Sequence, residues 1–349
     1  MRKKIKLLVL SLTGECNFAC VYCYASEHQS QKMSFETAVA AINLAYQEGE
    51  ELVLQLSGGE PLLAFELIEQ LITYIEAQQL KIKVQIQTNA SLLTDKIAKF
   101  LYAHKVAIGV SLDGRAPVNN KLRKLKNGSG ATATILAGIE VLRRNNIATG
   151  ITCVVTSENV NDLMGIIEMS YYLGNVRKIG FDLLRGQGRG EMLAPASARE
   201  IDIILPKVYA LTEQLHKLTG IKITIAQLER VATLNKGIDE YFGHCYAMNG
   251  KAVFVDAGGD IYACSSLVGN QDFYLGNVHT GLCTKLQAQV EAKIHASMDF
   301  CENCASFKLC GGGCFARWYG SGDKQLYEAE CALKNQSIKK FLNKRQLKI

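Results

Sequence analysis

Hydrophobic and polar residues follow two alternating periods over the first two thirds of the chain. Short apolar runs typical of buried strands are separated by longer segments in which apolar residues recur at helical spacing. Strand-like runs cover 6–12, 52–56, 84–87, 106–112, 151–155 and 179–184, and helix-periodic segments cover 65–75, 95–103, 134–144, 160–173 and 198–218. Strands that alternate with helices favour βαβ units and a parallel sheet, so the pattern predicts an α/β fold.

The regular alternation stops near residue 220, and cysteines become dense from Cys245 onward. A length of 349 residues suits about two domains. We therefore predict a β/α part over 1–220, a linker region over 221–244 and a cysteine-rich domain over 245–349. A Gly- and Arg-rich break at 186–190 lies inside the first part.

Composition excludes several classes of protein. Hydrophobic residues make up 48% of the chain, but no apolar run is as long as the ~18 residues of a membrane span, and no signal peptide is evident. We predict a cytoplasmic protein that does not bind membranes. Twelve cysteines in such a protein favour metal binding or catalysis over disulfides. The net charge of +6 is spread along the chain, and its basic runs are typical of solvated faces, so nucleic-acid binding is not expected.

Three cysteines, Cys16, Cys20 and Cys23, follow the first strand-like run directly. Thiolates at this spacing can converge on one metal centre, and no fourth ligand lies nearby in the sequence. Structural zinc sites almost always have four ligands, whereas an iron–sulfur cluster left with three has an iron free for a small molecule. The triplet therefore predicts an open cluster.

This CxxxCxxC triplet resembles the signature of the radical S-adenosylmethionine (SAM) enzymes. The resemblance implies a partial (β/α)6 TIM-like barrel in which SAM chelates the unique iron of a [4Fe–4S] cluster. It also implies that reductive cleavage of SAM gives a 5′-deoxyadenosyl radical, which removes a hydrogen atom from substrate. Tyr22, between the second and third cysteines, corresponds to a family residue that packs near the adenine.

A second stretch, Ser57-Gly58-Gly59-Glu60-Pro61, resembles the family's GGEP motif. Glycines let a backbone approach a ligand closely. The resemblance implies that Gly58 and Gly59, with Glu60, hold the methionine ammonium group. The alternative is an ordinary strand-to-helix turn with proline at the start of the helix.

Two further strand ends carry residues that resemble SAM contacts. Asn89 belongs to a Thr-Asn pair like one near the cofactor in the family, and Ser111 begins a Ser-Leu-Asp-Gly motif whose serine contacts the ribose or carboxylate. Arg123 corresponds to an arginine that pairs with the SAM carboxylate, a bidentate role that lysine fills poorly. The loop before it departs from the family pattern, with Arg115 in place of the usual proline. For all three residues, ordinary loop hydrogen bonding is the alternative.

Three residues on later strands have less specific signals. Asp182 and Arg185 flank the end of the sixth strand-like run and could line the substrate cavity. Cys153 lies inside the fifth run, which predicts a buried thiol of the core. No catalytic residue is assigned from the sequence.

The cysteine-rich part resembles the SPASM domain of radical SAM maturases, with Gly259 and Gly311-Gly312-Gly313 at the family's glycine positions. A pair of zinc sites is the alternative. The resemblance implies that four cysteines hold a distal auxiliary cluster and three a proximal one, giving three [4Fe–4S] clusters in all. The distal set is Cys301, Cys304, Cys310 and Cys331, and the proximal set is Cys245, Cys264 and Cys314. The proximal cluster is either open to a substrate or closed by Cys283, for which we favour no special role.

SPASM enzymes mostly modify peptides or proteins. The leading hypothesis is a maturase that makes a thioether or another cross-link in a ribosomally synthesised precursor peptide. The alternative is an anaerobic sulfatase maturase that makes formylglycine. In those enzymes an aspartate near the auxiliary cysteines serves as base, whereas here Ser265 and Ser266 follow Cys264, which counts against this alternative. A non-catalytic scaffold would need no cofactor pocket. We expect an electron donor such as flavodoxin or ferredoxin. Few residues precede Cys16, so we expect a separate leader-binding protein or direct docking of the peptide.

Overall fold

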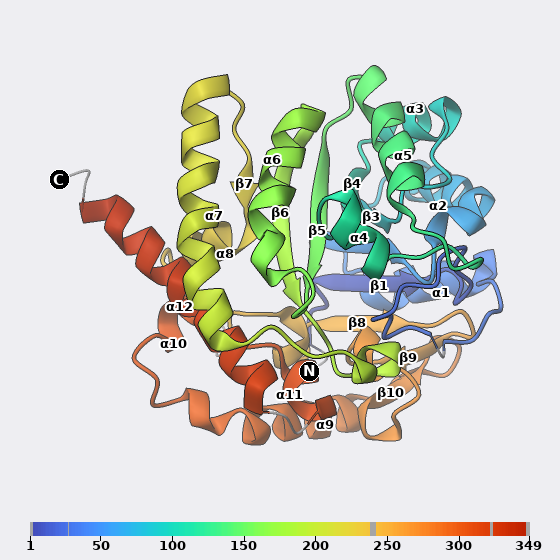
Figure 1. The fold of residues 1–349 in the computed structure, drawn as a ribbon. Helices are drawn as coiled ribbons and strands as arrows, with labels where there is room; N and C mark the ends of the chain where they lie inside the picture. Colours follow the sequence, from blue (N-terminus) through green and yellow to red (C-terminus); the bar gives the residue numbers. More distant parts are fainter. Residues whose placement is uncertain (1–2, 27, 238–241, 322–323, 347–349) are drawn as a thin grey trace.

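The computed structural model describes residues 3–26, 28–237, 242–321 and 324–346. The strands of this part form one eleven-stranded sheet in the order β11-β10-β9-β8-β1-β2-β3-β4-β5-β6-β7 (Figure 1). Strands β1 to β7 run parallel to their neighbours. Their bounds are β1 Leu7–Ser11, β2 Leu52–Ser57, β3 Ile82–Thr88, β4 Ala107–Ser111, β5 Thr149–Val155, β6 Val176–Leu183 and β7 Thr224–Ile225. The predicted α/β fold with a parallel sheet is confirmed.

Helices connect these strands and cover the outer face of the sheet (Figure 1). Several begin at the residues that favour helix starts: the Ser34 hydroxyl caps the first of them, and Ser197 and Glu200 form a capping box at the seventh. The helices of this part are α1 Phe35–Ala45, α2 Phe65–Ala77, α3 Asp95–Ala103, α4 Ala116–Leu122, α5 Thr132–Arg144, α6 Leu163–Leu173, α7 Ala198–Thr219 and α8 Ala226–Leu234.

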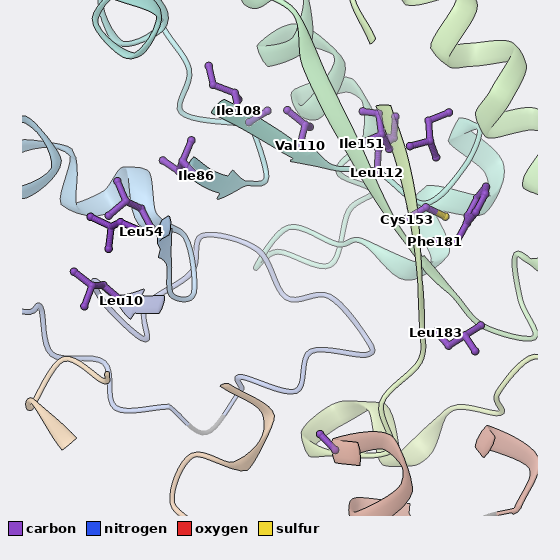
Figure 2. Packing of buried hydrophobic residues seen from close by; sticks show 14 of the residues in the cluster. Leu10, Leu54, Ile86, Ile108, Val110, Leu112, Ile151, Cys153, Phe181 and Leu183 are labelled. Atoms are coloured by element: carbon purple, nitrogen blue, oxygen red, sulfur yellow. The ribbon is translucent and has the colours of Figure 1, made fainter. Parts of the chain in front are cut away.

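Alternate residues of each strand face the helices and form the core. Leu10, Leu54 and Ile86 lie on successive strands in Figure 2, followed by Val110 and Ile151. The predicted burial of Cys153 is confirmed, because its thiol lies in this layer and is fully buried.

The residues between these core positions face inward. Because side chains alternate along a strand, the inward set is more polar and includes Gln55, Gln87 and Thr152. Side chains from all six of the strands β1 to β6 line one cavity, so the sheet curls around it as a partial barrel. The carboxyl ends of parallel strands meet at one edge of such a barrel, and that edge carries the functional loops.

The cysteine-rich part continues the same sheet. Strand β8 (Ala252–Val255) pairs in parallel with β1, and β9 (Asp260–Tyr262), β10 (Tyr274–Asn277) and β11 (Gly281–Leu282) follow as an antiparallel series. The predicted linker region contains β7 and α8.

Four helices complete the cysteine-rich part: α9 Thr284–Ser297, α10 Phe307–Cys310, α11 Phe315–Ser321 and α12 Lys324–Gln346. Figure 1 shows α9 and α11 beyond the carboxyl edge of the strands, and α12, in red, packs against α7. None of the helices in the described ranges combines the length and apolar character needed to cross a membrane.

Candidate active site and metal centres

The loop after β1 brings its three cysteines to one cavity. Cys16, Cys20 and Cys23 all line a cavity of about 400 Å³ at the carboxyl edge of the barrel. Burial raises the pKa of the Cys16 thiol to about 12 and also raises that of Cys20. Buried thiols ionise readily only when a cation offsets the loss of water. Three thiols around one cavity, two of them with raised pKa values, fit the metal-binding role predicted from their spacing.

The three cysteines lie on the lining of this cavity, and the charges of Cys20 and Cys23 act on Cys16. Within the described ranges, no group of three or more His, Cys, Asp or Glu residues is arranged to hold a single metal ion. An open iron–sulfur cluster at these three cysteines stays a prediction from their spacing.

The two glycines after β2 pack directly against the cysteine loop. A Cβ at Gly58, whose φ is +141°, would lie 2.3 Å from the Thr13 carbonyl oxygen, and one at Gly59 would lie 2.2 Å from that of Glu15. The Gly59 N–H donates to the Thr13 carbonyl at 2.7 Å. Both glycines line the cavity. The contact that leaves no room for a side chain at either position is with the backbone of the cysteine loop.

Glu60 ties the ends of β2 and β3 together. Its buried carboxylate accepts hydrogen bonds from the Thr88 hydroxyl at 2.6 Å, the Asn89 N–H at 2.7 Å and the Leu62 N–H at 3.1 Å. Burial raises its pKa to about 7 despite these donors. Glu60 thus positions the strand ends, and a cation in the cavity would offset the cost of its buried charge.

Asn89 and Ser111 also line the cavity and are held by neighbours. The Asn89 amide donates to the Asn17 side-chain oxygen at 2.9 Å and lies 3.9 Å from the Cys16 sulfur. The Ser111 hydroxyl accepts from the Gln87 amide at 2.9 Å, and the Thr152 hydroxyl donates to the Gln87 oxygen at 3.1 Å.

Tyr22 and Arg123 meet at Asp113. The Tyr22 hydroxyl donates to the Asp113 carboxylate, and Arg123 Nε lies 2.8 Å from Asp113 Oδ2. The Arg123 guanidinium is 5.4 Å from the centre of the Tyr22 ring and 4.0 Å from the Cys20 sulfur. Both residues line the cavity. Much of the Arg123 charge is therefore balanced by Asp113, while the guanidinium remains beside Cys20.

The proximal cysteines, Cys245, Cys264 and Cys314, line a second cavity of about 580 Å³. Burial raises the pKa of Cys245 to about 11, and the neighbouring Cys264 and Cys314 raise it further. One buried polar atom beside them, Arg185 Nε, has no hydrogen-bond partner among the described residues, and the Ser266 side chain hydrogen-bonds Cys264. The sulfurs of a cluster would supply acceptors there, so these residues fit such a group.

The distal cysteines gather around Tyr327, whose hydroxyl lies 2.9 Å from the Cys301 sulfur and also bonds Cys331. Burial raises the pKa of Cys331 to about 11, and the nearby Cys301 and Cys304 raise it further. Cys310, whose pKa burial raises to about 11, is next to Cys331. The chain then reverses at Gly311 and Gly312, both with positive φ. Cys283 lies apart, exposed at the N-cap of α9 and outside the lining of the proximal cavity.

Asp182, Arg185 and Ser265 line both cavities and so form a shared wall, which we call the junction. Arg185 donates to Asp182 at 2.9 Å and lies over the Tyr24 ring at 4.9 Å. Asp182 also accepts from the buried Arg317 of α11, which bonds Glu330 of α12 as well. Burial disfavours the Asp182 carboxylate, but Arg185 and Arg317 outweigh it and lower its pKa.

The sequence was compared with known families and curated proteins. Residues 10–170 match the family model described as the radical SAM superfamily. An uncharacterized protein of Methanocaldococcus jannaschii, MJ0907, is 34% identical over 277 residues, covering 79% of this chain and 89% of that protein. The chain belongs to the radical SAM superfamily. It is thus an enzyme of a group that uses SAM and a [4Fe–4S] cluster.

Two further matches extend over nearly the whole chain. A cysteine-type anaerobic sulfatase-maturating enzyme of Clostridium perfringens is 25% identical over 342 residues, covering 89% of this chain and 88% of that protein. The solved structure of native anSMEcpe with bound AdoMet and Kp18Cys peptide superposes with a TM-score of 0.80 at 22% identity, covering 97% of this chain and 98% of that one. The radical SAM fold, with its cysteine-rich C-terminal part, is therefore shown for this enzyme.

Every SAM-contact residue predicted from the sequence lines the first cavity. Sequence reasoning missed Gln87 and Asp113, which bond predicted SAM contacts, and Arg317, which bonds Asp182 in the junction. Asp113 stands inside the Ser-Leu-Asp-Gly motif, so its position beside Ser111 was a usable signal. Gln87 had the weaker signal of a polar residue inside a strand run.

Proposed function

We propose that this radical SAM enzyme is a peptide maturase that makes a thioether or another cross-link in a ribosomally synthesised peptide. The observation that carries the proposal is the junction, where the cavity of the radical-cluster cysteines and that of the proximal cysteines share Asp182, Arg185 and Ser265. A substrate lying along this wall could contact both cavities. anSMEcpe, which has the same fold, holds a peptide together with AdoMet.

The residues divide into three sets in this proposal. Cys16, Cys20 and Cys23 would hold the radical cluster, and the SAM contacts would be Tyr22, Gly58, Gly59, Glu60, Asn89, Ser111 and Arg123. The seven C-terminal cysteines would hold two auxiliary clusters. When bound, these groups supply a deoxyadenosyl radical and an acceptor for one electron. The chain orients the substrate between the cavities and excludes water, which turns a collision into a positioned reaction.

Thioether formation is favoured because the resemblance gives the proximal cluster three cysteine ligands, where a cubane takes four thiolates. Cys310 also lines the proximal cavity, but the resemblance assigns it to the distal set. A substrate thiolate is the natural soft donor for the vacant position. Joining the sulfur to a carbon breaks one S–H and one C–H bond. The C–H hydrogen leaves with deoxyadenosine, and the thiol hydrogen leaves as a proton and an electron.

The test uses cysteine-containing precursor peptides, the first choice being the product of any short cysteine-rich reading frame found beside the gene. The anaerobically reconstituted enzyme, with SAM and dithionite, should form deoxyadenosine and a peptide lighter by two hydrogen atoms for each bond. The cysteine of that product should no longer react with iodoacetamide. Deoxyadenosine formation with an unchanged peptide would contradict the proposed reaction. Flavodoxin or ferredoxin should replace dithionite, and a separate leader-binding protein should raise turnover.

Iron content tests the number of clusters. Ten cysteines are proposed as ligands, so the reconstituted enzyme should contain roughly twelve irons, at about four for each cubane. Cys283→Ala should keep all of them, because Cys283 is exposed and outside the proximal cavity. Iron equal to a single cluster, or stoichiometric zinc, would refute the auxiliary clusters. Loss of a cluster in Cys283→Ala would mean that the proximal site is closed and takes no substrate thiolate.

Sulfatase maturation is the second candidate, supported by the 25% identity to the cysteine-type enzyme of Clostridium perfringens. Ser265, the residue after Cys264, disfavours sulfatase maturation because a serine hydroxyl is a far weaker base than an aspartate. Asp182 is the nearest replacement in the junction, but its two arginine partners hold it ionised and lower its basicity. Conversion of the Kp18Cys peptide to a formylglycine product, detected as a hydrazine-reactive aldehyde, would favour this candidate over cross-linking.

A further inference from the structure

The Gly- and Arg-rich segment 186–190, for which the sequence suggested no role, folds back onto the cysteine loop. It leads from β6 into a short 3-10 turn, Gly188–Met192. The Arg189 N–H donates to the Cys23 carbonyl at 3.1 Å, and Arg189 Nε donates to the Cys20 carbonyl at 2.8 Å. One arginine therefore binds the backbone of two of the three radical-cluster cysteines.

The flanking glycines allow this contact. Gly188 has a φ of +53°, and a Cβ there would lie 2.7 Å from the Cys23 carbonyl oxygen and 2.9 Å from Ser26 Oγ. A Cβ at Gly190 would lie 2.3 Å from the Arg185 carbonyl oxygen. A side chain at Gly188 would push the segment off the cysteine loop, whereas one at Gly190 would clash with the segment's own backbone at Arg185. The first glycine of the Gly-Arg-Gly pattern is thus explained by close packing on that loop, and the second by the tight turn that presents Arg189.

The same segment also reaches the proximal cysteines. Gln187 Nε2 donates to the Ala316 carbonyl at 3.0 Å, two residues after Cys314 on α11. Residues 187–189 therefore bridge the backbone of Cys20 and Cys23 on one side and the helix that follows Cys314 on the other. We call residues 187–190 the bridge.

The Cys20 carbonyl also accepts the Cys23 N–H at 3.3 Å, which closes the turn between the two cysteines. Arg189 adds a second donor to that carbonyl. Because the donor is charged, this bond is stronger than a neutral one. The guanidinium also places positive charge beside a loop whose three thiolates must be held close together.

We propose that Arg189 is a positioning residue, which holds the radical-cluster loop closed and, through the bridge, fixes it relative to α11. The role follows from backbone contacts and holds for any substrate of the enzyme. It differs from direct SAM contact, because Arg189 does not line the SAM cavity.

Hydrogen–deuterium exchange of the anaerobic holoenzyme tests this directly. Arg189→Ala should speed exchange in peptides that cover 16–26 by about tenfold, because losing a hydrogen bond from a charged donor shifts the opening equilibrium by about that factor. In Arg189→Ala, the EPR signal that responds to SAM, which reports the radical cluster, should be lost faster in air than in the wild type. The signals of the auxiliary clusters should be lost at the wild-type rates. Arg189→Lys, which keeps the charge and one donor, should recover part of the difference.

Arg177→Ala is the matched control. Arg177 is another exposed arginine that donates to two backbone carbonyls, those of Gly174 and Val176, at the opposite end of β6. It should leave exchange in 16–26 unchanged. Gly188→Ala provides an independent arm, because it displaces the bridge while retaining Arg189 and should also speed exchange and loss of the radical-cluster signal. Wild-type rates of exchange and signal loss in both Arg189→Ala and Gly188→Ala would overturn the proposal, as would equal changes in Arg177→Ala.

Discussion

Cys20→Ala should abolish the formation of 5′-deoxyadenosine by the anaerobically reconstituted enzyme. Cys20 is buried between Cys16 and Cys23 on the loop after β1, and two remaining thiolates cannot hold the cluster. Changes in groups around a metal ligand already cost 10–100-fold, so we expect a loss of more than about a hundredfold on removing the ligand itself. The variant should stay folded, and its iron should fall by roughly a third, because the auxiliary ligands lie in the C-terminal part.

Cys283→Ala is the matched control, since it removes an exposed cysteine that faces neither cavity. Chromatographic quantification of deoxyadenosine, with dithionite as reductant, measures both variants. Deoxyadenosine at the wild-type rate from Cys20→Ala would refute the assignment of the radical cluster to this loop.

The strands could be predicted from the sequence because the residues of each strand that face the helices are buried and apolar, which gives a short apolar run in the sequence. The sequence pattern missed α1, Phe35–Ala45, although Ser34 caps it. This helix is rich in alanine and follows a long polar loop, so its apolar period was weak. The pairing of β8 with β1 joins residues far apart in the chain. Local periodicity carries no information about such a pair.

The position of the SAM-contact residues was predictable for a different reason. Five of them stand at or directly after the carboxyl end of a strand, and Tyr22 and Arg123 lie in the segments that follow β1 and β4. Parallel strands bring those ends to one edge. Arg123 bonds Asp113, ten residues away inside a recognisable motif, so this partner left a signal in the sequence. Arg317 bonds Asp182, which lies 135 residues away in the sequence. That pair depends on the tertiary packing of α11 against the barrel, which no single stretch of sequence encodes.

Arg317 should be the side chain on which the docking of α11 depends most. It is buried, its Nε donates to the Leu183 carbonyl at 2.9 Å, and its other nitrogens bond Asp182 and Glu330. Arg317→Met would leave the buried Glu330 carboxylate facing the more distant Lys334, 3.9 Å away. Breaking a buried pair by removing one partner costs about 3–5 kcal/mol, so the free energy of unfolding should fall by about that amount.

Lys340→Met is the control that shows how much of the loss of stability is due to burial of the ion pair. Lys340 of α12 pairs with Glu213 of α7 at 2.6 Å and also joins the C-terminal part to the barrel, but both side chains are partly exposed. Loss of this ion pair should lower the free energy of unfolding by less than about 1 kcal/mol. Urea unfolding of the two variants measures the difference. Adding Asp182→Asn and Glu330→Gln to Arg317→Met should recover part of the stability, because the stranded charges are then removed. If Arg317→Met loses no more than Lys340→Met, the buried network does not hold α11 against β6, and the junction must be kept together by apolar packing alone.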